Sequence, residues 1–124
     1  MDRRLYLCAA LAGFTGVALG AFGAHALKGQ VGPELLGAFE AGARYQMYHA
    51  FALCAAAWGW ARWQHRLFGV AGGLFVAGIV LFSGSLYLLA ATGTKWLGMI
   101  TPVGGVAFLG GWLCLGLGTY RARR

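Results

Sequence analysis

Acidic residues are scarce in this sequence of 124 residues, which has three Asp and Glu against ten Lys and Arg. None of the three falls inside a long apolar run, which argues against a proton relay built from carboxyl groups within a membrane. The three cysteines, Cys8, Cys54 and Cys114, lie singly inside apolar runs without CxxC spacing. We interpret them as small apolar residues rather than metal ligands.

Motifs of common catalytic and nucleotide-binding sites are also missing. The chain contains no Walker loop, dinucleotide fingerprint, zinc-protease motif or nucleophile elbow around a serine. We therefore expect a protein that is not an enzyme and has no cofactor.

Apolar residues dominate what is present, at 60% of the chain. Four apolar runs, at about residues 5–27, 45–61, 67–90 and 96–118, approach or exceed the roughly 20 residues that a helix needs to cross a hydrocarbon core. The sequence predicts an all-α fold in which residues 1–124 form a single transmembrane domain, a four-helix bundle in a lipid bilayer.

A more polar segment separates the first two runs. Pro33 and Glu34 are typical of a helix start, and Glu40 and Arg44 are spaced for an ion pair along one helical side. Leu35, Leu36, Phe39 and Ala43 repeat at helical spacing on the other side. This pattern predicts a short amphipathic helix at about residues 33–44 that lies at the membrane surface.

The basic residues predict the orientation of the chain. Seven of the ten lie at the amino terminus, between the second and third runs, or at the carboxyl tail, while Lys28, Arg44 and Lys95 lie on the other side. The side richer in Lys and Arg is cytoplasmic, so both termini are expected there. Because the net charge of +7 is explained by this placement, we expect no nucleic-acid partner.

Glycine is abundant, with 22 residues. Small residues at spacings of three or four let membrane helices approach closely. Such contacts serve either packing within one bundle or association between copies, and the sequence leaves both open. The glycines with this spacing are Gly13, Gly16, Gly20 and Gly23 in the first run, and Gly69 and Gly73 in the third.

Polar residues inside the runs gather toward one side of the membrane. With 1.5 Å per residue, most lie within about 10 Å of the outer ends of the predicted spans, and all four spans contribute. Buried ionisable residues in membranes mark candidate sites by default. The candidates for binding a ligand are His25, Lys28, Tyr45, Gln46, His49, Ser83, Ser85, Tyr87 and Thr101.

Two neutral histidines, His25 and His49, have the chemistry to bind a metal or a haem. No third or fourth ligand is evident at their depth, where Met47 and Met99 are weak additions. We therefore predict no metal site. The alternative to a ligand site is that the histidines and hydroxyl groups satisfy one another between helices.

Four segments resemble those of a known family: GAFGAHALK from Gly20, YQMYHAFAL from Tyr45, FSGSLYLLA from Phe82 and GMITPVGGVAFLGGW from Gly98. Together they are similar to the small bacterial inner-membrane proteins of domain-of-unknown-function family 423, which has mitochondrial-type relatives in animals. The resemblance implies a four-span helical protein in the bacterial inner membrane and implies no activity.

Three hypotheses for the function follow. The first is a polar pocket in the outer leaflet that binds a small ligand, a lipid headgroup or a partner. The second is an accessory subunit of a larger membrane complex. The third is an oligomeric transporter or channel with its pore between copies, because polar residues do not cross the full thickness of one copy.

Overall fold

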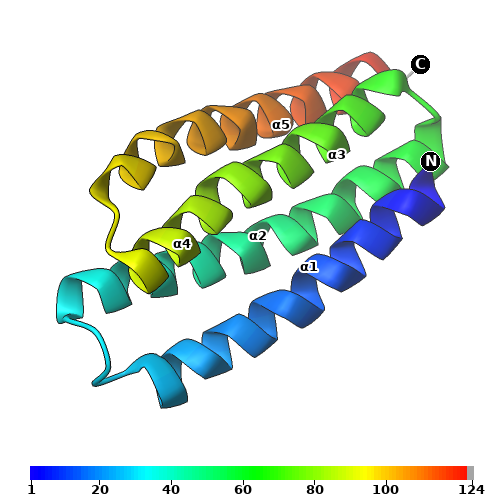
Figure 1. The fold of residues 1–124 in the computed structure, drawn as a ribbon. Helices are drawn as coiled ribbons and strands as arrows, with labels where there is room; N and C mark the ends of the chain where they lie inside the picture. The colour runs from blue at the N-terminus through cyan, green and yellow to red at the C-terminus, as the bar shows by residue number, and fades with distance from the viewer. Residues whose placement is uncertain (123–124) are drawn as a thin grey trace.

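The computed structural model describes residues 1–122, which form four long helical rods with short turns between them (Figure 1). The residues Arg123 and Arg124, which contribute to the predicted orientation, lie outside the described part. Within the described part, the only pairing of the β type is an isolated bridge between Lys28 and Val31. The first rod is α1 (Asp2–Phe22) continued by the π-helical turn η1 (Gly23–Leu27), and the second is α2 (Pro33–Trp63). The third rod comprises α3 (Arg66–Gly78), the π-helical turn η2 (Ile79–Ser83) and α4 (Gly84–Thr92). The fourth rod is the 3-10 turn η3 (Lys95–Met99) followed by α5 (Thr101–Ala122).

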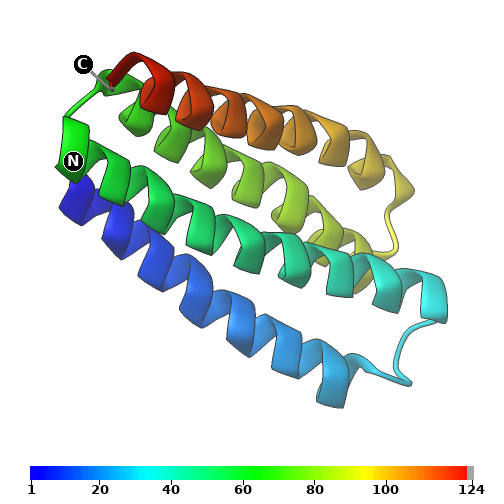
Figure 2. The same cartoon turned by 180° about the vertical axis from the view of Figure 1, so that it is seen from behind.

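The rods lie roughly in chain order, with α2 between α1 and the rest. Helix α1 packs mainly against α2, α2 contacts α3, η2 and α4, and α5 packs against α3 and η2. Figure 2 shows the same order from behind, with the amino terminus, the carboxyl end and the α2–α3 turn at one end. The turns before α2 and before η3 lie at the other end. This order places each rod antiparallel to its neighbour.

Three of the four rods are long and apolar enough to cross a membrane: Asp2–Leu27, Arg66–Thr92 and Lys95–Ala122. They correspond to the first, third and fourth predicted spans. The all-helical class and the membrane-spanning character of these rods agree with the sequence prediction.

The second rod differs from its prediction. Residues 33–44 do not form a separate interfacial helix, because α2 runs without a break from Pro33 to Trp63 over 31 residues. The sequence becomes more apolar near Tyr45, but the helix continues through this position. The start of α2 at Pro33, after the extended Gly32, is as predicted.

Local features end the rods. Gln64 adopts a left-handed conformation with φ 53° and ends α2, and the side chain of His65 accepts a hydrogen bond from the Leu67 amide at the start of α3. Gly93, with φ 68°, ends α4. Pro102 occupies the first turn of α5, where its missing N–H breaks no helical hydrogen bond. The 3-10 turn η3 precedes this first turn.

Large side chains on one rod fill the space above glycines on the next. Phe68 lies over Gly59, Phe75 over Gly111, and a Cβ at either glycine would overlap the facing ring. The two rings are almost completely buried, and Phe75 belongs to the main core cluster together with Leu53. Close approach of the backbones therefore depends on these glycines.

The glycines predicted to pack differ in what they contact. Gly16 lies against Met47 and Gly23 against Phe39, whereas a Cβ on Gly69 would make ordinary contacts with Met1 and Trp60. The other three face open space, because a Cβ added to them would have no atom of a neighbouring element within 4 Å: Gly13, Gly20 and Gly73.

Candidate functional site

Gln46 is the centre of a hydrogen-bonded cluster that joins three helices. Its side chain is 4% exposed, and Nε2 donates to the carbonyl oxygen of Ala12 (2.9 Å) and to Thr15 Oγ1 (2.7 Å) on α1. On the other side, the Tyr87 hydroxyl donates to Gln46 Oε1 (2.6 Å). Thr15 in turn donates to the Leu11 carbonyl, so both amide protons and the threonine hydroxyl are used. The amide thus connects α1, α2 and α4.

Two serines connect the third rod to its neighbours. Ser83, which is fully buried at the end of η2, donates to the Gly42 carbonyl at 2.6 Å. A Cβ on Gly42 would lie 3.3 Å from the Ser83 carbonyl oxygen, so the glycine allows this approach. Ser85 Oγ and Thr101 Oγ1 lie 2.6 Å apart and join α4 to α5. The hydroxyl groups that the sequence placed in one layer are therefore divided among separate contacts.

His49 lies between α2 and α5 with both ring nitrogens occupied. Nδ1 lies 2.7 Å from the Tyr45 carbonyl oxygen, which accepts only, so Nδ1 carries the proton. Nε2 then accepts from the indole N–H of Trp112 at 3.1 Å. The imidazole stacks on Phe108 with ring centroids 3.5 Å apart and an interplanar angle of 8°. This neutral tautomer has no nitrogen left for a metal or haem iron.

Two of the remaining candidates, His25 and Lys28, do not join these contacts. His25 is exposed in η1, and Lys28 is exposed in the turn that follows. The Tyr45 ring is partly exposed, contacts Tyr48 and Phe82, and stacks on the His49 ring with centroids 6.4 Å apart. Among the described residues, the structure thus brings together three pairs of candidates: Gln46 with Tyr87, Ser85 with Thr101, and Tyr45 with His49. It does not place His25 beside His49.

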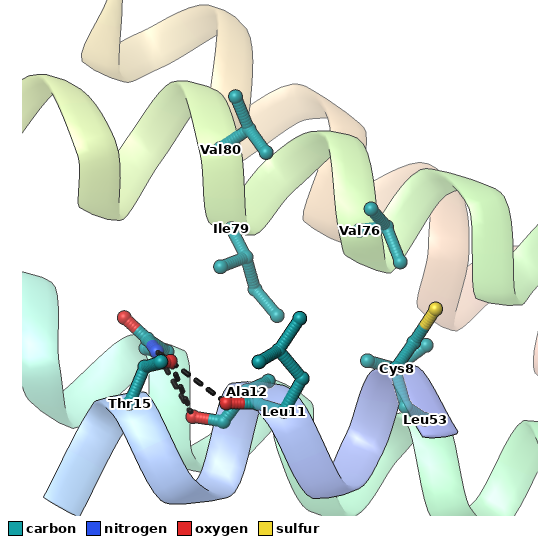
Figure 3. A pocket seen from close by; sticks show the side chains of 9 residues that line it. Cys8, Leu11, Ala12, Thr15, Leu53, Val76, Ile79 and Val80 are labelled. Carbon is teal, nitrogen blue, oxygen red and sulfur yellow. Dashed lines mark hydrogen bonds between the residues drawn. The ribbon is translucent and has the colours of Figure 1, made fainter. Parts of the chain in front are cut away.

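A cavity of about 180 Å³ lies next to the Gln46 cluster, between α1 and the third rod (Figure 3). Helix α1 meets α3 near the amino terminus, where Leu5 covers Gly72, and the two rods separate beyond that contact. Leu11 and Val80 at the rim are largely exposed, so the cavity opens sideways. Its lining is apolar except for one amide and one hydroxyl; it consists of Cys8, Leu11, Ala12, Thr15, Gln46, Leu53, Val76, Ile79 and Val80.

Sequence reasoning missed several of these partners. Trp112 belongs to a predicted apolar run, although a buried indole N–H generally needs an acceptor and so hints at a polar neighbour. The sequence places Thr15 near mid-depth, outside the expected polar layer. Gln46 reaches Thr15 because α2 continues for more than three turns before Gln46, which moves this residue toward the middle of the rods.

The fold and the buried interhelical hydrogen bonds define a small helical membrane protein. The chain belongs to the family described as Protein of unknown function (DUF423), whose model matches residues 19–105. The family expected from the four sequence segments is thereby confirmed.

Relatives match over most of the chain. The UPF0382 membrane protein YwdK of Bacillus subtilis is 46% identical over 104 residues, covering 80% of this chain and 81% of that protein. The UPF0382 inner membrane protein YgdD of Escherichia coli K12 is 40% identical over 123 residues, covering 99% of this chain and 94% of that protein. No solved structure is significantly similar to the chain.

Proposed function

We propose that this protein is a non-enzymatic membrane protein that crosses the bacterial inner membrane four times and holds an apolar chain, such as a lipid acyl or isoprenoid chain, in the cavity between α1 and the third rod. The single observation that carries the proposal is this cavity, which is apolar, opens sideways and has the buried Gln46 in its lining.

The position of α2 supports four spans. Its first turns lie beside the other rods and not across their ends, because Phe39 packs on Gly23 and Tyr87 packs on Gly42. A bilayer that contains the three apolar rods therefore contains α2 as well. Its polar side chains Gln46 and His49 are buried against other helices, which allows a less apolar helix to cross.

Both termini are expected in the cytoplasm. The end of the molecule that carries the termini also carries Arg3, Arg4, Arg62, Arg66 and Arg121, whereas the opposite end has Lys28 and Lys95. The positive-inside rule assigns the arginine-rich end to the cytoplasm. The Escherichia coli relative is named an inner membrane protein, which supports the same membrane for this chain.

Reporter fusions test this topology. A fluorescent protein joined after Arg124 is expected to fluoresce, and alkaline phosphatase at the same position to be inactive, while phosphatase inserted in the turn between Lys28 and Gly32 is expected to be active. A three-span arrangement would place the two termini on opposite sides. An active phosphatase at the carboxyl end would contradict the proposed topology.

The dimensions of the cavity suit part of an apolar chain. A dry apolar cavity of about 150 Å³ is large enough to hold a benzene-sized molecule. The present cavity is open toward the region where lipid chains lie, so a longer chain can enter with one end and remain in the bilayer with the other. The Gln46 Oε1 accepts one hydrogen bond, from Tyr87, and keeps a second lone pair for a ligand hydroxyl.

A photoreactive lipid tests occupancy of the cavity. Liposomes with a diazirine-bearing acyl chain are expected to label the lining residues, chiefly Cys8, Val76 and Val80, above the level at other lipid-facing positions. Val76→Phe fills the cavity and is expected to lower labelling of Cys8 several-fold. The sites would be located by mass spectrometry of peptides.

Val106→Phe is the matched control, because Val106 is 68% exposed on α5 and does not line the cavity. It is expected to leave the labelling pattern unchanged. Labelling that is equally strong at Phe14 and Leu113, both on open faces, would show only the surrounding lipid and would contradict a bound chain.

The second candidate is an accessory subunit of a membrane complex. Among the described residues, every buried side-chain nitrogen or oxygen has a hydrogen-bond partner. The interior therefore leaves no buried polar group unpaired for a ligand, which supports a role through contacts with other proteins. Native mass spectrometry from mild detergent separates the candidates, since a defined complex with another protein favours the subunit and a retained lipid favours the cavity.

A further inference from the structure

One face of α2 is open along its whole length. The buried residues of the helix face α1, the third rod and α5, and the residues opposite to them are exposed. They recur at spacings of three and four. This open face consists of Gly37, Glu40, Arg44, Tyr48, Phe51, Ala55 and Trp58.

The contacts of α2 place Arg44 at membrane depth. Gly16 lies against Met47 and Gly23 against Phe39, so Arg44 is level with a point about 6 Å beyond the midpoint of the first rod. The contact between Gly42 and Tyr87 gives a similar level on the third rod. A hydrocarbon core extends about 15 Å from its centre, so both Arg44 and Glu40, one turn nearer the end, lie within it.

Both charges lack a partner in the monomer. Within residues 1–122, the only ion pair joins the amino group of Met1 to Asp2. Glu40 and Arg44 have the spacing of a helical ion pair but do not form one. Charged side chains that face lipid in this way are costly, and such residues are usually paired or turned toward protein.

We propose that the open face of α2 is the interface of a homodimer in the membrane, in which Glu40 of each copy pairs with Arg44 of the other. A two-fold axis along the membrane normal brings identical faces together. This axis leaves both copies at the same depth, so Glu40 of one copy lies about 6 Å in depth from Arg44 of the other. The long arginine side chain reaches across this offset, and the symmetry makes two equivalent diagonal ion pairs. Both charges are thereby removed from lipid.

The shape of the face suits a second copy. Gly37 and Ala55 are small and let two α2 helices approach. Along the same face, the exposed rings of Tyr48 and Phe51 lie between these two small residues. The inference rests on α2 crossing the membrane, as proposed above, and does not depend on what the cavity binds.

Cross-linking in liposomes tests the interface. In a chain with Cys8, Cys54 and Cys114 replaced by Ala, Phe51→Cys is expected to form a disulfide-linked dimer on mild oxidation at low protein-to-lipid ratio. Phe14→Cys on α1 is the matched control, since Phe14 is 77% exposed and lies away from the open face. Equal cross-linking of both variants would indicate random collision and overturn the proposal.

Charge exchange tests the ion pairs. Glu40→Arg and Arg44→Glu are each expected to lower the dimer fraction, measured by single-molecule photobleaching, with an association constant at least about tenfold weaker. The double variant Glu40→Arg with Arg44→Glu is expected to recover the dimer, which also shows that the single changes do not act through misfolding. The proposal would be overturned if the unaltered chain were monomeric, or if the single variants had the same dimer fraction as the unaltered chain. Arg44 would then be a residue whose side chain reaches the lipid headgroups. If the reporter fusions give the expected four-span topology but no dimer is found, the dimer is refuted and the proposed topology stands.

Discussion

Gly104→Ala is expected to destabilise the fold by about 1–3 kcal/mol, in the range of overpacked cores. An added Cβ would lie 2.7 Å from the Cα of Phe82 in η2, which is backbone and cannot turn away. Helix α5 would have to move outward, and the stacking of Phe108 on His49 would be disturbed with it. The midpoint of unfolding in detergent with increasing dodecyl sulfate measures the effect.

The adjacent residue supplies the control. A Cβ on Gly105 meets no atom within 4 Å, so Gly105→Ala is expected to leave the free energy of unfolding unchanged or to raise it slightly through better helix propensity. Equal stability of the two variants would show that α5 and η2 are farther apart than the structure places them.

Gln46→Leu is expected to lower stability by about 2 kcal/mol, since three hydrogen bonds to other helices are lost at roughly 0.6 kcal/mol or more each. The change leaves the Tyr87 hydroxyl and Thr15 without their partner. Because α1 packs mainly on α2, this rod is expected to loosen first. Hydrogen exchange of the α1 amides and the unfolding midpoint would report both effects.

Thr119→Val is a suitable comparison for the glutamine variant. Thr119 is exposed on α5, and its hydroxyl donates to the Leu115 carbonyl of the same helix. Its removal is expected to change stability by less than about 0.5 kcal/mol. Tyr87→Phe, which removes one of the three bonds, is expected to fall between the two; a loss as large as that of Gln46→Leu would contradict an additive cluster.

Much of the fold follows from the sequence because lipid imposes a simple rule on apolar segments. The three most apolar runs correspond to the three apolar rods, and the turns at Gly29 and Gly93 lie between predicted spans. The second rod is harder to predict, because the buried Gln46 and His49 and the exposed charges of its first half all depress its hydropathy. Hydropathy reports composition and cannot show that Gln46 faces protein.

The sequence indicates most of the polar residues that the fold buries, but it indicates neither their partners nor the cavity, whose lining includes only Gln46 of the nine predicted candidates. Gln46, His49, Ser83, Ser85, Tyr87 and Thr101 all form interhelical hydrogen bonds or lie in the interior, as polar residues in membrane helices tend to do. Which pairs form depends on the register between helices. The sequence prediction started the second span at Tyr45, and this start displaces the predicted membrane depth of every residue on α2. The partners Ala12 and Gly42 use carbonyl oxygens, which a sequence pattern does not reveal.

The order of the rods also bears on biogenesis. A chain inserted from its amino terminus presents α1 to the membrane first, and its main packing partner, α2, follows directly. Gln46 can then bond to Ala12 and Thr15 within a two-helix hairpin. The Gln46 side-chain oxygen would then lack the Tyr87 hydroxyl until the third rod inserts, so we expect the third rod to complete the hydrogen bonds of this amide.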